Sequence, residues 1–268
     1  MRKLLFLAAI SLCIMLFSNH LLAQDEEYIA LRTNTPPTID GDLSDWALAW
    51  STAEGVYLDE WEELGGTSKG PNDISLTFYI LWDDDNLYFA AEVKDDDQLH
   101  ENTGESIWNG DSFQIAIDPT GERNVAAFDG LSFEYNFGLD VNDKVVLSRL
   151  FGNPEGWPSN FADPMKNEDE LAIVRDDDND KTYYELRIPT EDLAPADFVP
   201  DGQIGLGLIY NDSDKSHPGQ TGWVGWGSQA VVFGKDNTQM NLVIFSGEML
   251  AVNSKNKLAA TWGYAKTR

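Results

Sequence analysis

The 268-residue chain carries 46 acidic residues against 18 basic ones, which gives a formal net charge of −28. A surface of this charge repels nucleic acid and anionic membranes, so neither is an expected partner. The single cysteine, Cys13, lies in an N-terminal apolar run. The rest of the chain therefore has neither disulfides nor cysteine ligands for zinc.

The N-terminus has the pattern of a secretory signal peptide. Arg2 and Lys3 precede an apolar run over residues 4–17, and Ala23 stands just before the first acidic residues. The run is shorter than the roughly 18 apolar residues that a spanning helix needs, and no later stretch approaches that length. We expect a signal peptide over residues 1–23, an acidic leader over 24–35, no membrane span, and a secreted or periplasmic protein.

The clearest local pattern begins at residue 75. Apolar residues alternate over 76–82 and again over 87–93, and the polar turn Asp83–Asn86 separates the two runs. This spacing predicts a β-hairpin. A third strand is predicted over 113–117, while the polar, glycine-rich stretch 52–72 is expected to have little regular structure.

Short strands separated by turns continue to the end of the chain. A glycine- and tryptophan-rich loop is expected over 217–227. About nine short strands with few helical patterns predict an all-β fold, a single antiparallel, jelly-roll-like β-sandwich over 36–245. Residues 246–268 are expected to be a tail or a last strand. The later strands are predicted at 131–137, 145–150, 171–174, 182–188, 204–210 and 240–245.

Acidic residues cluster at turns and at strand ends. Calcium takes roughly six to eight oxygen ligands, and carboxylates in such positions can supply them. A solvated turn without metal has the same composition, so both interpretations stay open. The candidate calcium ligands are Asp83, Asp95, Asp96, Asp111 and Asp118.

Tryptophan is abundant, with nine residues, and several lie in predicted loops. A tryptophan in a loop either closes the end of a sandwich or contacts a ligand. Sugar rings stack on aromatic faces, while their hydroxyl groups bond to amides and carboxylates. The candidate sugar-binding residues are Trp108, Trp223, Trp226, Asn109 and Gln114.

The sequence nominates no catalytic residue. It has no nucleophile elbow or phosphate-binding loop, and His100 and His217 lack metal-binding spacing. Two carboxylates about 5 to 9.5 Å apart could hydrolyse a glycosidic bond, so a glycoside hydrolase is the alternative function. A haem- or partner-binding periplasmic module, with an axial ligand such as His217, Met165 or Met240, is the third.

A series of motifs, in order along most of the chain, resembles carbohydrate-binding module family 9. The resemblance implies a β-sandwich, found on secreted xylan- and cellulose-degrading enzymes, that binds the ends of sugar chains between two tryptophans and holds structural calcium. The matching motifs are Pro37–Gly41, Asp45–Trp46, Leu81–Asp83, Asn86–Tyr88, Val93–Asp95, Trp108–Ser112, Ile117–Asp118, Tyr184–Glu185, Ile188–Pro189 and Phe233–Gly234.

Within this resemblance, Trp108 matches the first sugar-binding tryptophan, and Trp226 is the choice for the second, with Trp223 as its competitor. Two positions depart from the well-studied sugar-binding member. Gln114 stands where that member has glutamate, and Glu134 stands where it has arginine. We therefore expect a non-catalytic protein that binds a xylan- or glucan-type glycan, accessory to glycan degradation, with the sugar left open by these two changes.

Overall fold

The computed structural model describes residues 26–46, 55–63, 70–125, 130–151, 161–162, 170–232 and 235–249. The predicted signal peptide and residues 250–268 lie outside these ranges. The described parts contain 14 strands and short 3-10 helices, and none of their helices has the length and apolar character that a membrane crossing requires.

The strands join in one sheet with the order β10-β11-β5-β4-β1-β14-β12-β6-β7-β8-β9; β2 pairs with β4, and β13 pairs with both β12 and β3. Their bounds are β1 (Glu27–Arg32), β2 (Val56–Leu58), β3 (Trp61–Glu63), β4 (Ile74–Trp82), β5 (Asn86–Asp95), β6 (Ser112–Asp118), β7 (Phe133–Leu139), β8 (Val145–Phe151), β9 (Phe161–Ala162), β10 (Leu171–Asp176), β11 (Lys181–Pro189), β12 (Gln203–Asp214), β13 (His217–Trp226) and β14 (Asn241–Met249).

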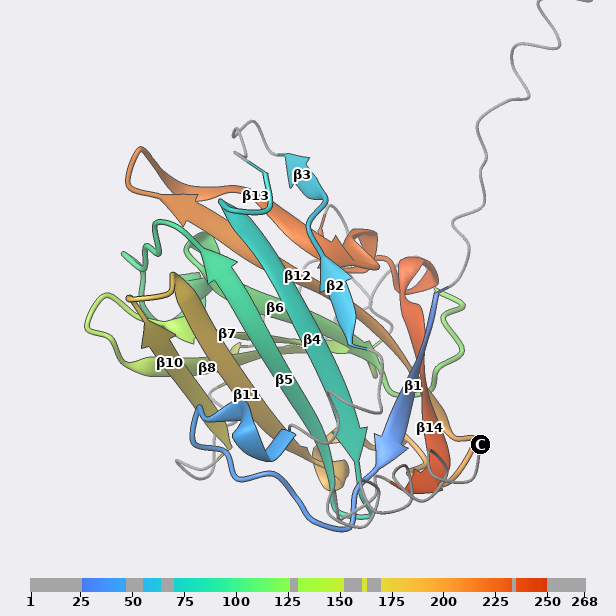
Figure 1. Ribbon diagram of the computed structural model, residues 1–268. Helices are drawn as coiled ribbons and strands as arrows, with labels where there is room; N and C mark the ends of the chain where they lie inside the picture. Colours follow the sequence, from blue (N-terminus) through green and yellow to red (C-terminus); the bar gives the residue numbers. More distant parts are fainter. Residues whose placement is uncertain are drawn as a thin grey trace, which may run out of the picture.

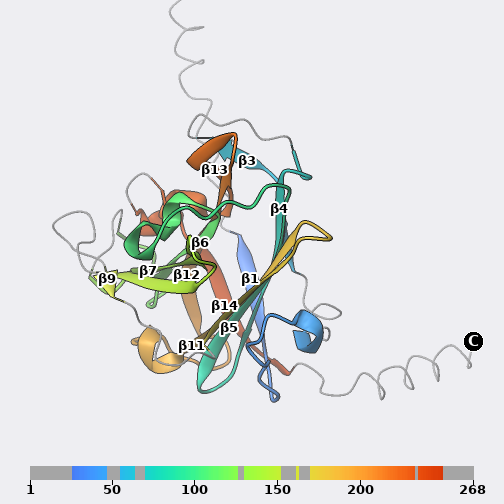
Figure 2. The same ribbon diagram turned by 90° about the vertical axis from the view of Figure 1, so that its left-hand side faces the viewer.

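The sheet folds over so that its two halves face each other (Figures 1 and 2). Aromatic rings meet across the core. The ring centroid of Phe113 on β6 lies 5.0 Å from that of Tyr184 on β11 and 5.3 Å from that of Phe89 on β5. Almost all pairs among the described strands are antiparallel, and of these strands only β1 pairs in parallel, with β14 and β4. The predicted all-β sandwich is confirmed.

The predicted hairpin forms as its alternation requires. Trp82 pairs with Leu87 across the turn, and Trp82 is fully buried. Asp83 Oδ1 accepts hydrogen bonds from the backbone N–H groups of Asp85 and Asn86, both at 2.8 Å. An Asx side chain thus stabilises the turn between two strands that bury their apolar residues.

The predicted loop over 217–227 was wrong, because these residues contain the whole of β13. The described part of 52–72 contains the two three-residue strands β2 and β3, and β1 lies within the leader 24–35. These segments lack a clear alternation of apolar and polar residues. Pairing with distant strands supplies their conformation, because β2 lies on β4 and β13 lies between β12 and β3.

Candidate functional site

Polar side chains line the side of β6, β7 and β12 that is turned away from the core. Side chains alternate along a strand, so residues between the core-facing aromatics point to the opposite side. Gln114 pairs with Asn136 of β7, and Ser112 pairs with Asn211 of β12. We call this set the polar face; its members are Ser112, Gln114, Glu134, Asn136 and Asn211, all buried.

Hydrogen bonds connect the polar face to a buried lysine. The Lys235 ammonium donates to Glu134 Oε2. Gln114 Nε2 donates to Glu134 Oε1 at 2.8 Å, and Asn211 Nδ2 donates to Gln114 Oε1 at 3.1 Å. Asn136 Oδ1 is buried and has no hydrogen-bond partner among the described residues. A buried oxygen of this kind is normally satisfied by water or a ligand.

The hydrogen-bond chain continues from the polar face to the protein surface. Gln220 Nε2 donates to Asn211 Oδ1, and the Gln220 backbone N–H donates to Asn109 Oδ1 at 3.0 Å. Asn109 ends the 3-10 helix η2 (Gly104–Asn109). Its neighbour Trp108 is 39% exposed, one of the exposed large hydrophobic side chains of the described residues. These hydrogen bonds therefore connect the buried Lys235–Glu134 ion pair to Asn109, the sequence neighbour of the exposed Trp108.

The two tryptophans of β13 lie on opposite sides of that strand. Trp223 pairs with Asn211, on the side of the polar face, and is 1% exposed. Trp226 is 4% exposed and packs against Phe78 in the core, with ring centroids 5.6 Å apart. Strand alternation thus turns the indole of Trp226, the sequence-based choice as partner of Trp108, away from the polar face.

Six aspartates converge at one end of β4, β5, β6 and β12. They form two groups of three, and within each group the carboxylate oxygens lie within 4.8 Å of one another. We call both groups together the acidic cluster. One group is Asp95, Asp111 and Asp212, and the other is Asp73, Asp96 and Asp214.

The first group of three aspartates is buried, and burial raises the pKa values of their carboxyl groups. Burial, with neighbouring carboxylates, raises the pKa of Asp95 from 3.8 to about 7 and that of Asp212 to about 8. The pKa of Asp111 is raised well above its usual value for the same reasons. Asp95 Oδ2 has no hydrogen-bond partner among the described residues. An oxygen-lined site with negative charge and an unsatisfied oxygen fits a hard cation such as calcium.

Of the predicted calcium ligands, the structure brings Asp95, Asp96 and Asp111 together. The sequence analysis missed Asp73, just before β4, and also Asp212 and Asp214, at the end of β12, because nothing in the local sequence marks them as partners of Asp95. The only signal was their position at strand ends or in alternation with core residues.

Two predicted ligands, Asp83 and Asp118, belong to neither group of aspartates. The Asp83 carboxylate bonds to its own turn and accepts from the Tyr88 hydroxyl at 2.8 Å. Asp118 accepts backbone hydrogen bonds from Thr120 and Arg123, both at 2.9 Å. Both carboxylates are satisfied by donors close in sequence, so they stabilise turns.

Comparison with known proteins supports the architecture. A search of curated proteins found no match. A family 9 carbohydrate-binding module from Caldicellulosiruptor kristjanssonii, solved in complex with cellotriose, is 16% identical, with 85% of this chain and 97% of that chain covered and a TM-score of 0.58. A structure of a family 9 module from the same organism, solved in complex with glucose, is 15% identical, with 86% and 100% covered and a TM-score of 0.54. At these identities the likeness shows a shared fold.

The family itself is shown by the sequence. The model of the carbohydrate family 9 binding domain-like family matches residues 39–240, a span that includes the hairpin, the polar face and the acidic cluster. The predicted resemblance is confirmed, and the chain belongs to the carbohydrate family 9 binding domain-like family.

Proposed function

We propose that this is a secreted, non-catalytic protein that binds a xylan- or glucan-type glycan at the Trp108 end of the polar face, as an accessory to glycan degradation. The observation that carries the proposal is the continuous hydrogen-bond chain that connects the buried polar face to Asn109, beside the exposed Trp108. The relatives solved with cellotriose and glucose support the ligand class.

The chemistry of this end suits a sugar ring. An exposed indole offers a flat apolar face for the C–H groups of a pyranose. Sugar hydroxyl groups both donate and accept, and the amides of Asn109 and Gln220 can do the same. Because Asn211 already holds the Gln220 amide and the Gln220 backbone N–H holds the Asn109 amide, little conformational entropy is lost when a sugar binds.

The test is the substitution Trp108→Ala, followed by calorimetric titration with cellotriose and xylotriose. We expect affinity to fall at least about tenfold, which corresponds to about 1.4 kcal/mol. The unfolding temperature should change by no more than about 2 °C, because the side chain is 39% exposed.

The matched control is Val174→Ala, which truncates another exposed side chain on β10 and should leave binding unchanged. A large fall in unfolding temperature with unaltered binding would show that Trp108 is a packing residue. Release of reducing sugar during the titration would indicate a glycoside hydrolase instead.

The proposal includes structural calcium at the acidic cluster, held by Asp95, Asp111 and Asp212 with the neighbouring group of Asp73, Asp96 and Asp214. Burial of several carboxylates without a cation is costly, and the unsatisfied Asp95 Oδ2 supports the assignment. When bound, a cation would neutralise these charges and tie β5 and β12 to the segment before β6.

Calcium added to chelator-treated protein should raise the unfolding temperature by several degrees, because the folded state alone has the assembled ligands. The increase should be lost in Asp111→Asn and kept in Asp118→Asn, whose carboxylate lies outside the cluster. Differential scanning calorimetry with and without calcium measures both. If the unfolding temperature is the same with calcium and with chelator, the calcium assignment is wrong.

A further inference from the structure

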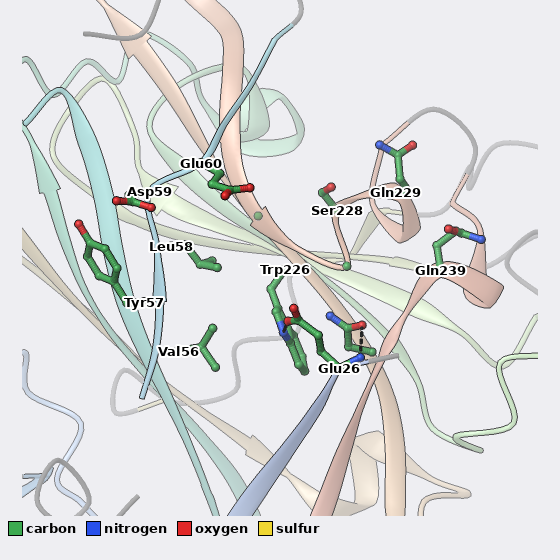
Figure 3. A pocket seen from close by; sticks show the side chains of 13 residues that line it. Glu26, Val56, Tyr57, Leu58, Asp59, Glu60, Trp226, Ser228, Gln229 and Gln239 are labelled. Atoms are coloured by element: carbon green, nitrogen blue, oxygen red, sulfur yellow. Dashed lines mark hydrogen bonds between the residues drawn. The ribbon is translucent and has the colours of Figure 1, made fainter. Parts of the chain in front are cut away.

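A pocket of about 650 Å³ opens beside β2, where β13 ends (Figure 3). None of the residues that line it belongs to the polar face. Trp226 lines the pocket, whereas Trp223 points to the other side of β13. Its volume lies within the range of roughly 300 to 1,000 Å³ that small-molecule sites occupy. The pocket is therefore large enough for a ligand and separate from the Trp108 site.

One wall of the pocket is apolar and fixed. Val56 and Leu58 alternate with Tyr57 along β2 and point toward Trp226 (Figure 3). The Trp226 indole N–H donates to the Glu26 carboxylate, and its ring packs on Phe78. The Glu26 carboxylate and the Phe78 ring thus fix the position of the indole, so this wall need not rearrange when a ligand binds.

The rim of the pocket is polar and acidic. Ser228, Gln229 and Gln239 offer a hydroxyl and two amides, and Asp59 and Glu60 offer carboxylates. No lysine or arginine occurs among the described residues that line the pocket. An apolar wall with hydroxyl, amide and carboxylate groups around it matches the two-sided chemistry of an uncharged sugar ring, and the carboxylates disfavour an anionic one.

We propose that this pocket is a second saccharide site, one that takes a neutral pyranose and rejects uronic acids. The inference rests on the proposed carbohydrate-binding function, but it needs neither Trp108 nor the polar face. Two sites on one small domain would let the protein engage a glycan at two points, which raises the avidity for polymers over that for short oligomers.

The test counts sites in the full chain by native mass spectrometry and calorimetry with cellotriose, glucose and glucuronate. The pocket variant is Glu60→Ala with Gln239→Ala, two exposed side chains on the rim. Its control is Glu248→Ala, an exposed acid at the end of β14. We expect two sugars per wild-type chain, one in Trp108→Ala, one in the pocket variant, and none when the three substitutions are combined.

Binding at the pocket, measured in the Trp108→Ala background, should be at least about tenfold weaker for glucuronate than for glucose. One sugar per wild-type chain, abolished by Trp108→Ala alone, would overturn the second site and leave the proposed function standing. A single site that is lost only in the pocket variant would support the pocket and overturn the Trp108 assignment. No sugar bound at all would overturn both.

Discussion

At the scale of single residues, Glu185 joins two motifs that are far apart in the sequence, Pro37–Gly41 with Asp45–Trp46 and Tyr184–Glu185. Its Oε1 accepts a hydrogen bond from Trp46 Nε1 at 2.6 Å, and its Oε2 accepts from the backbone N–H groups of Asp40 and Gly41 at 2.9 and 2.5 Å. One buried carboxylate on β11 thus fastens the turn at Gly41 and the 3-10 helix η1 (Leu43–Trp46) to the sheet.

We predict that Glu185→Ala destabilises the protein by about 2 to 4 kcal/mol, because it leaves three donors, two of them buried, without an acceptor. Chemical denaturation monitored by circular dichroism measures the loss. The control is Glu92→Ala on β5, whose ion pair with Lys181 is partly exposed and contributes at most about 1 kcal/mol. Equal losses for the two variants would show that Glu185 does not fasten the turn.

Single positions also explain why the site was only partly predictable. Asp95 and Asp111 were found because each stands at the end of a clearly alternating strand. Asp212 lies in the polar run Asn211–Asp214 at the end of β12, and only the fold brings it to the other two. Ligands that converge from different strands cannot be read from local spacing.

At the scale of elements, strands whose core-facing apolar residues recur at every second position were predicted well. β4, β5 and β6 contain the alternating residues Phe78, Phe89 and Phe113, which meet in the core. Both faces of these strands are largely buried, but their core-facing apolar residues recur at every second position, and that period is enough to locate the strands from the sequence.

β13 shows why other elements could not be predicted. Its sequence is rich in glycine, and Gly222 lies directly against the Trp61 ring of β3, where a side chain would overlap the ring. The glycine is there because another strand crosses closely, which is a tertiary requirement. Since β13 had the signature of a loop, the opposite orientation of Trp223 and Trp226 could not be predicted either.

At the scale of the whole molecule, the acidic cluster concentrates six of the aspartates of a chain whose formal net charge is −28. Asp95 and Asp212 have ordinary pKa values of 3.8, raised to about 7 and about 8 in the folded protein. Between about pH 4 and pH 8 the metal-free folded state therefore holds protons that the unfolded chain has released. Folding takes up protons in this window, so stability is highest at its acid end.

We predict that chelator-treated protein is less stable at pH 8 than at pH 5, as these buried carboxylates lose their protons without a cation to replace them. Calcium competes with protons for the same oxygens, so its stabilising effect should be larger at pH 8 than at pH 5. Thermal unfolding at both pH values, with calcium and with chelator, gives the four unfolding temperatures that this prediction compares.

Asp212→Asn provides the control for this prediction, because it removes one titrating group and should flatten the pH dependence of the chelator-treated protein. The substitution also removes a calcium ligand, so the increase with calcium at pH 8 should shrink in the same variant. If calcium raised the unfolding temperature equally at pH 5 and pH 8, the cation would bind elsewhere than at these protonated carboxylates. An increase of metal-free stability from pH 5 to pH 8 would contradict the burial of uncompensated acid that the cluster implies.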